Sequence, residues 1–418
     1  MTTNTRPANS RNSIFERNPK ITILFVITIV GLTLDIVLTN IFSLYRDIKY
    51  DVPNILTSQP TLGTKHEVYH HDLIKNGMIE AKYTLYHDRK IKLHTNSLGF
   101  KDNASRTIPL LPSNKFKKRI VFIGDSFTEG IMLEYENTFV GMIDKELNNK
   151  SIEVLNAGVA SYSPIIYWRK IKYLIEEVGL KFNDLIVFID ISDFIDEKNR
   201  YRLSKRGHVI DQEHTFLEKE DQYSSGVIGR IKKFINSRTT LLYHTTNTLH
   251  DLINRDTTTN FLWDVAEKRS EMGVWYNSFT HPGRRRTWVF ERNNPDHELI
   301  KQKMIKHMDK LLRLTRDNNI KLTICIYPWP FQVWHEDLNS VHVKLWEEWS
   351  RRNNVYFINY FPDFISEGLT NKEKLETVKK YYLPADVHFN RQGNKLISKK
   401  FLEKYFPAET FPKKLARK

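Results

Sequence analysis

Two motifs far apart in the sequence carry the side chains needed for covalent catalysis by a serine. Ser126 follows a short apolar run, residues 120–123, which we expect to form a buried strand. In the last part of the chain, Asp386 and His388 are separated by one residue. A serine hydroxyl, an imidazole base and a carboxylate that orients the base are the minimum set for acyl transfer through a covalent serine intermediate. We therefore predict that Ser126, His388 and Asp386 form a catalytic triad.

The expected place of Ser126 in the fold also favours a role in binding or catalysis. Gly124 allows the chain to turn where the strand ends, and open α/β sheets bind ligands at this carboxyl edge. An isolated Gly-Asp-Ser is more often a surface serine, and only the second motif favours catalysis. The nucleophile elbow of α/β-hydrolases is not expected, because it needs glycine where Thr128 stands.

The motifs together resemble the SGNH/GDSL hydrolase superfamily. GDSFTEG (residues 124–130) is similar to its first block, and LNAGVASYSP (155–164) to its second. DVHFNRQGN (386–394) is similar to its last block. HTNSLGFKD (94–102) is typical of membrane-anchored members, and the main resemblance covers residues 118–406.

The resemblance implies a fold, an oxyanion hole and a class of reaction. The fold is a three-layer α/β/α sandwich with a mainly parallel, flavodoxin-like sheet. The oxyanion hole consists of the backbone N–H groups of Ser126 and Gly158 and a third donor. That third donor is usually an asparagine, but Ser192 is aligned with it, and losing one donor costs about 10²–10³ in turnover. The one-residue spacing of Asp386 and His388 is similar to that of alginate-type O-acetyltransferases.

The alternation of apolar runs and amphipathic segments favours the same α/β class. Alternating units of this kind imply a mainly parallel sheet covered on both faces. Residues 197–296 are too long for a plain loop, and we expect a partly helical insertion that forms one wall of the active-site cleft. The predicted strands are 119–123, 153–156, 185–189, 322–327 and 355–359, and the predicted helices are 137–147, 165–177, 298–315, 338–351 and 393–405.

An apolar run near the amino terminus predicts a membrane anchor. Residues 21–34 are apolar apart from Thr and Gly, and apolar positions resume after Asp35, whereas about 20 residues suffice to cross a bilayer. No small-residue cleavage site follows, which favours a retained signal anchor over a signal peptide. Basic residues dominate before the run, so the amino terminus is expected in the cytoplasm and the catalytic domain in the periplasm or cell exterior.

The expected organisation follows from this anchor. It comprises a cytoplasmic tail (1–19), a transmembrane signal anchor (20–45), a juxtamembrane stalk (46–115) that folds partly onto the catalytic domain, the catalytic domain (116–407) and a basic tail (408–418). Cys325 is the single cysteine, which excludes an internal disulfide, and we expect it to be a buried apolar residue.

Charge and aromatic residues suggest ligands without identifying one. The formal net charge of +15 favours anionic partners such as phospholipid headgroups or acidic glycans, whereas no nucleic-acid-binding motif is present. The densest basic cluster, 283–288, is more often a solvent loop than a lipid or sugar contact. Trp329 and Trp334, beyond the strand predicted at 322–327, are our candidates for contact with the substrate, and the alternative is that they pack the insertion against the core. No cofactor and no metal are expected, although Glu129 and Asp193 could imitate a metal site.

These features predict a serine-dependent esterase, or an O-acyl (acetyl) transferase, acting on a carbohydrate or another cell-envelope ester. Transfer needs an acceptor site that outcompetes water, and the sequence leaves hydrolysis and transfer open. The alternative is a non-catalytic or weakly active envelope or glycan-binding protein on the same scaffold, because the asparagine donor is missing. An intact triad argues against that alternative.

Overall fold

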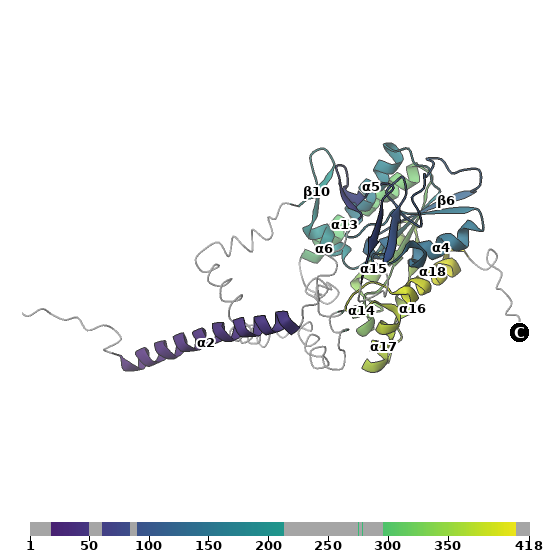
Figure 1. Ribbon diagram of the computed structural model, residues 1–418. Coiled ribbons are helices and arrows are strands. Elements are labelled where there is room, and N and C mark those ends of the chain that lie inside the picture. Colours follow the sequence, from purple (N-terminus) through teal and green to yellow (C-terminus); the bar gives the residue numbers. More distant parts are fainter. Residues whose placement is uncertain are drawn as a thin grey trace, which may run out of the picture. The chain divides into compact units, whose positions relative to one another are not determined.

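The computed structural model describes residues 18–49, 61–83, 90–212, 275, 278 and 296–406 (Figure 1). The chain divides into two compact units, one of residues 1–54 and 214–259 and the other of residues 55–213 and 260–418. In the first unit the structure describes helix α2 (Pro19–Lys49). All strands of the described chain belong to the second unit.

The apolar run near the amino terminus is helical, because residues 21–34 lie within α2. Among the helices of the described ranges, however, none is both long enough and apolar enough to cross a membrane. The transmembrane helix of the predicted fold is therefore not confirmed. The location of the catalytic domain outside the cytoplasm stays a prediction.

An eight-stranded sheet forms the centre of the second unit, in the order β12-β11-β8-β6-β7-β5-β4-β3. The strands from β12 to β7 are parallel, and β5, β4 and β3 extend the sheet in antiparallel pairing. The predicted α/β class is confirmed, and the sheet is mixed. The bounds are β3 (Met78–Ala81), β4 (Ile91–Thr95), β5 (Lys101–Asp102), β6 (Lys118–Ile123), β7 (Ile152–Asn156), β8 (Asp184–Ile189), β11 (Lys321–Ile326) and β12 (Tyr356–Asn359).

Strand order reverses at β6, and this reversal decides where a ligand can bind. The chain runs from β6 to β7 on one side and then returns to β8 on the other side of β6. Right-handed crossovers consequently place α4 (Phe139–Asn148) on one face and α5 (Pro164–Glu176) and α13 (Asp296–Asp317) on the other. Helix α18 (Arg391–Tyr405) packs against α4, and α13 packs against α5 (Figure 1). Such a reversal opens a crevice at the carboxyl ends of the strands.

Shorter elements connect these layers. Strands β1 (Gly63–His66) and β2 (His70–Leu73) form one antiparallel hairpin, and β9 (Tyr201–Leu203) and β10 (Val209–Asp211) form another. The remaining elements are α3 (Ser126–Glu129), η1 (Tyr135–Asn137), α6 (Asp193–Asn199), α14 (Pro330–Trp334), α15 (Val341–Arg352), α16 (Phe361–Phe364) and α17 (Asn371–Tyr381).

Part of the segment predicted as a stalk is built into the eight-stranded sheet of the second unit. Strand β5 pairs with β7 at Lys101 and Asn156, which gives the outer edge of β7 a backbone partner. Residues 61–83 and 90–115 therefore belong to the same compact unit as the strands that follow.

Most of the predicted insertion lies outside the described residues. Its described beginning forms the end of α6 and the β9–β10 hairpin. The basic cluster 283–288 and the basic tail 408–418 also lie outside the described ranges. Cys325 is a free, fully buried thiol in β11, as predicted.

A buried ion pair attaches the amino-terminal hairpin to α5. The Lys170 ammonium is fully buried and donates to Asp72 Oδ1 at 2.8 Å, to the Ala157 carbonyl oxygen at 3.1 Å and to the Tyr162 hydroxyl at 3.2 Å. Burial lowers the pKa of Lys170, and Asp72 opposes this effect. Asp72 also accepts a hydrogen bond from the Tyr69 hydroxyl at 2.6 Å.

We predict that Asp72→Ala lowers the free energy of unfolding by about 3–5 kcal/mol, because the Lys170 charge stays buried without its partner. The double variant Asp72→Ala/Lys170→Met should recover part of this loss, and urea unfolding measures both. The matched control is Glu80→Gln, which removes an exposed partner 3.8 Å from Lys92 and should cost less than about 1 kcal/mol. Equal losses for the two single variants would contradict the prediction.

Candidate active site

Ser126 begins helix α3 immediately beyond β6, at the strand-order reversal. Asp125 caps this helix, since its Oδ1 accepts from the Phe127 N–H at 3.0 Å. Gly124 is required at the turn, because a Cβ there would lie 2.7 Å from the carbonyl oxygen of Phe188. The strand end, the glycine and the cap together place the Ser126 side chain at the carboxyl edge of the sheet.

The structure brings Ser126, His388 and Asp386 into one hydrogen-bonded line. His388 Nε2 lies 2.8 Å from Ser126 Oγ, and His388 Nδ1 lies 2.5 Å from Asp386 Oδ1. A carboxylate only accepts, so Nδ1 carries the ring proton and Nε2 is left as the acceptor of the serine hydroxyl. The one-residue spacing in the sequence thus allows Asp386 to reach the far nitrogen of the ring.

The loop that carries His388 is held by backbone contacts on both sides. A β-bridge joins Tyr382 to Phe389, and the Leu383 N–H donates to the His388 carbonyl oxygen at 2.9 Å. Asn394 Oδ1 accepts from the Phe139 N–H at 2.8 Å and so ties α18 to α4. The imidazole is therefore positioned by the packing of these two helices.

Gly158 does not offer the free N–H group that the resemblance implies. Its N–H donates to Asn156 Oδ1 at 3.1 Å, so it would have to change partner to bind an oxyanion. Its lack of a side chain has a steric role instead, because a Cβ there would lie 2.9 Å from the backbone nitrogen of Glu129.

The backbone N–H of Ser161 is a further candidate for the oxyanion hole, and sequence reasoning missed it. In the part of the chain that the structure describes, the N–H groups of Ser126 and Ser161 make no hydrogen bond. Ser161 has a φ of 66°, a conformation that L-residues adopt rarely. Nothing local in the sequence marks such a serine, because the surrounding contacts impose its conformation.

Ser192 lies near Ser126, but its hydroxyl is engaged. Ser192 Oγ donates to Asp190 Oδ1 at 2.6 Å, and the Ser192 N–H donates to the same oxygen at 2.7 Å. Ser192 Oγ is also 3.5 Å from Asp125 Oδ2. The side chain therefore supports the acidic groups behind the serine and lacks a free proton for an oxyanion.

Three buried carboxyl groups, Asp125, Asp190 and Asp193, form a cluster behind Ser126, with ligand atoms within 4.8 Å of one another. Burial raises the pKa values of Asp125 and Asp193 well above their ordinary range, and repulsion from Asp190 adds to the effect. The Tyr327 hydroxyl lies 3.1 Å from Asp125 Oδ1 and 3.3 Å from Asp190 Oδ2.

Oxygen ligands of this kind suit Mg²⁺ or Ca²⁺, but the protein already supplies donors to most of them. Asp125 Oδ1, both oxygens of Asp190 and Asp193 Oδ2 each accept a hydrogen bond from a protein donor. We therefore interpret the cluster as a hydrogen-bonded network in which Asp125 and Asp193, whose pKa values are raised by burial, hold protons. Glu129, the other acidic residue considered for a metal, lies apart and accepts from the Ala160 N–H at 2.8 Å.

The two tryptophans predicted to bind substrate are buried. Trp329 is 7% exposed, and its indole N–H donates to Asp190 Oδ2 at 3.1 Å. Trp334, in α14, is 3% exposed. These positions favour the packing alternative over direct contact with a ligand.

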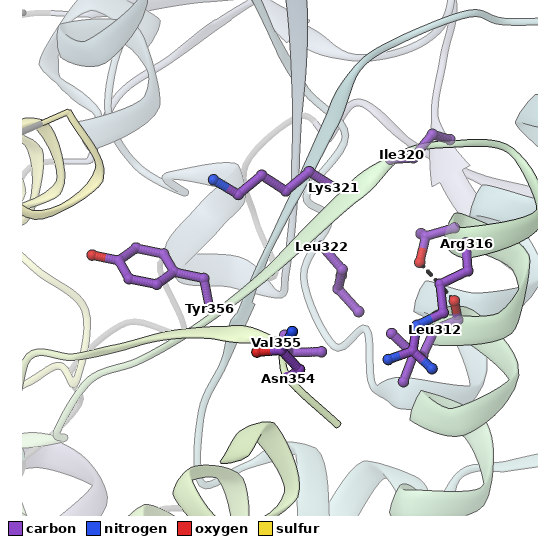
Figure 2. Close-up of a pocket in the computed structure, with 9 residues that line it drawn as sticks. Leu312, Arg316, Ile320, Lys321, Leu322, Asn354, Val355 and Tyr356 are labelled. Carbon is purple, nitrogen blue, oxygen red and sulfur yellow. Dashed lines mark hydrogen bonds between the residues drawn. The ribbon is translucent and has the colours of Figure 1, made fainter. Parts of the chain in front are cut away.

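A cavity of about 430 Å³ lies at the opposite edge of the sheet (Figure 2). It is formed where β11 and β12 begin, whereas Ser126 follows the carboxyl end of β6. The length of the parallel strands therefore separates the cavity from Ser126. The hydroxyl of Thr315 on its wall donates within α13, to the Leu312 carbonyl oxygen at 2.9 Å. Its lining is Leu312, Thr315, Arg316, Ile320, Lys321, Leu322, Asn354, Val355 and Tyr356.

Comparison with known proteins gives matches among solved structures. No family model matches the sequence, and no curated protein matches it. The psychrotrophic esterase EstA from Pseudoalteromonas sp. is 10% identical with a TM-score of 0.32, over 69% of this chain and 97% of its own. A putative lipolytic protein of the G-D-S-L family from Desulfitobacterium hafniense is 12% identical with a TM-score of 0.30, over 68% of this chain and 97% of its own. A mutant acetyl-xylooligosaccharide esterase from Geobacillus is 10% identical with a TM-score of 0.34, over 69% of this chain and 94% of its own.

We predict that Ser192→Asn raises esterase turnover, by up to about 10²-fold, because the longer amide adds an N–H donor that the hydroxyl does not supply. Ser192→Ala is the matched control and should change turnover little. Steady-state kinetics on an aryl acetate measure both variants. A sharp fall for the asparagine variant with no change for alanine would show that Ser192 is wrongly aligned.

We predict that Asp193→Asn stabilises the protein at neutral pH. The pKa of Asp193 is raised in the folded state, so the folded state binds more protons than the unfolded state above about pH 3.9, and stability falls as the pH rises through this window. The asparagine variant should lose this part of the pH dependence, and thermal unfolding between pH 4 and 8 measures it. Asp317→Asn, at an exposed position, is the control, and identical curves for both variants would contradict the prediction.

Proposed function

We propose that this protein is an SGNH/GDSL-type serine esterase that hydrolyses an acyl ester through a covalent intermediate on Ser126. One observation carries the proposal, namely the hydrogen-bonded line from Ser126 through His388 to Asp386 at the strand-order reversal. A binding protein on the same scaffold has no need of a nucleophile, its base and the group that orients the base.

The geometry supports a two-step reaction. Ser126 Oγ attacks the ester carbonyl carbon while His388 Nε2 takes the hydroxyl proton, and the Asp386 carboxylate stabilises the imidazolium that forms. The tetrahedral intermediate collapses, and the leaving alcohol takes the proton from His388. Water then attacks the acyl-enzyme with His388 again as the base, which releases the carboxylic acid and restores Ser126.

The backbone N–H groups of Ser126 and Ser161 are our candidates for the oxyanion hole, because neither has an acceptor in the described chain. Fixed backbone donors stabilise the negative charge that develops on the carbonyl oxygen.

Asp125 supports the nucleophile from behind. Its Oδ2 lies 3.0 Å from Ser126 Oγ, and burial and Asp190 raise its pKa. A protonated Asp125 donates to Ser126 Oγ and leaves the hydroxyl proton for His388, whereas an ionised Asp125 would compete with His388 for that proton.

As substrate we propose an acetyl ester of a carbohydrate or of another cell-envelope component. The net charge of +15 supports an anionic substrate, and the spacing of Asp386 and His388 is similar to that of O-acetyltransferases that act on polysaccharides. Acetyl transfer to a sugar in place of water is the corresponding transferase reaction.

We predict that the purified chain releases acetate from an aryl acetate and that Ser126→Ala lowers kcat by about 10³-fold or more. Ser113→Ala, at an exposed position, is the matched control. Mass spectrometry after rapid acid quench should find one acetyl group on Ser126 of the wild type. An unchanged rate for Ser126→Ala would refute the proposal, and acetylated product in the presence of a sugar acceptor would assign transfer instead of hydrolysis.

A further inference from the structure

Two adjacent histidines of β2 connect a surface carboxylate to the backbone beside the active serine. Asp211 Oδ1 lies 2.9 Å from His70 Nε2, and His70 Nδ1 lies 2.8 Å from His71 Nδ1. His71 Nε2 in turn lies 2.9 Å from the carbonyl oxygen of Ala160. These contacts form a continuous chain from the β9–β10 hairpin, through β2, to the loop of residues 157–161.

This loop packs against the segment that carries Ser126. The Val159 N–H donates to the Gly124 carbonyl oxygen at 3.2 Å, and the Ala160 N–H donates to Glu129 Oε2 at 2.8 Å. The Ala160–Ser161 peptide therefore lies between α3 on one side and the histidine pair on the other.

His71 fixes the orientation of the Ala160–Ser161 peptide. The bond is trans, so the Ser161 N–H is antiparallel to the Ala160 carbonyl group. A ring N–H that holds the carbonyl oxygen consequently directs the Ser161 N–H away from His71. The Tyr201 hydroxyl donates to the Ser161 carbonyl oxygen at 2.8 Å and holds the next peptide group.

The protons in this chain can be assigned from the groups at its two ends. A carbonyl oxygen only accepts, so His71 Nε2 carries a proton, and a carboxylate only accepts, so His70 Nε2 carries one as well. The contact between the two Nδ1 atoms needs one further proton. Two imidazoles with three protons carry one positive charge, so the chain is complete only when the histidine pair is charged.

Burial places that charge on His70. Burial lowers the pKa of His71 to about 4, and the His70 and Lys170 charges also lower it, whereas the Ala160 carbonyl group and Asp72 raise it. The His70 side chain is 23% exposed, and its partner Asp211 is 87% exposed. The neutral ring is thus the inner one, and the imidazolium is the outer one.

Other groups surround His70 on the neighbouring elements. The Tyr201 ring of β9 lies 4.9 Å from the His70 ring, between centroids. The hydrogen bond with His70 is the main cause that lowers the pKa of Asp211. The charges of His70, of Arg200 after α6 and of Lys65 in β1 lower it further. Asp211 therefore stays ionised and retains its role as acceptor at neutral pH.

We propose that His70 and His71 are positioning residues of the active site, which hold the Ala160–Ser161 peptide through a chain that is complete only while His70 is an imidazolium. This role rests on the proposed esterase function. Loss of the His70 proton removes one hydrogen bond of the chain and releases the His71 ring. His388 must by contrast be neutral to act as a base, so the active form needs a neutral His388 together with a charged histidine pair.

The kinetic test compares pH profiles of kcat on an aryl acetate for the full chain. The wild type should give a bell-shaped profile, and His70→Gln should lack the alkaline limb, with a kcat about tenfold lower at the optimum and KM little changed, because the loop is held less firmly. Asp211→Asn should shift the alkaline limb to lower pH, since His70 loses its counter-charge. The matched control is His208→Gln in the same hairpin, which should keep the wild-type profile, and an alkaline limb retained in His70→Gln would overturn the proposal.

A second measurement does not depend on activity. Nitrogen NMR of histidine-labelled Ser126→Ala protein, assigned with single histidine variants, should show His70 protonated on both nitrogens and His71 as the Nε2–H tautomer at neutral pH. A neutral His70, or a His71 with its proton on Nδ1, would overturn the proposal. If the NMR result holds but the wild type has no esterase activity, the function proposed above fails and the positioning role is withdrawn with it.

Discussion

The reversal of strand order at β6 is the constraint on which the rest of the structure depends. Because β7 and β8 lie on opposite sides of β6, the connections that follow these strands diverge and leave the end of β6 uncovered. The turn at Gly124 presents Ser126 in this opening, and the loops after β7, β8 and β11 converge around it. In a sheet of simple sequential order the connections would all leave to the same side, and no such crevice would open.

Buried polar contacts then fix the loops around this opening. Lys170 joins β2 to α5 and to the Ala157 carbonyl oxygen, and Asn394 joins α18 to α4. These groups are buried, so each contact that is lost leaves an unpaired charge or polar atom in the interior, and the loops have few alternative arrangements. Precision at the site thus depends on residues that touch neither the serine nor the histidine.

The sequence predicts secondary structure best where burial requires a run or a repeat of apolar residues. All five parallel strands and their main helices were predicted, because continuous apolar runs such as 185–189 can only be buried. Strands β3 to β5 and helix α17 were missed, since short or polar segments such as Lys101–Asp102 become strands only by pairing with a neighbour. The three predicted triad residues lie together, whereas Gly158 was expected to have a free N–H and Trp329 to face a ligand. Those two expectations depend on which partner a group finds in three dimensions.

The origin of the two halves of the site has a consequence for biosynthesis. Ser126 and His388 are 262 positions apart, and the loop of His388 is held by α18, which packs on α4. During synthesis the strands of the parallel sheet therefore leave the ribosome before the segment that contains His388. Ser126 is therefore synthesised well before its partner, and the hydrogen bond between Ser126 and His388 forms only once the segment that α18 holds has been added.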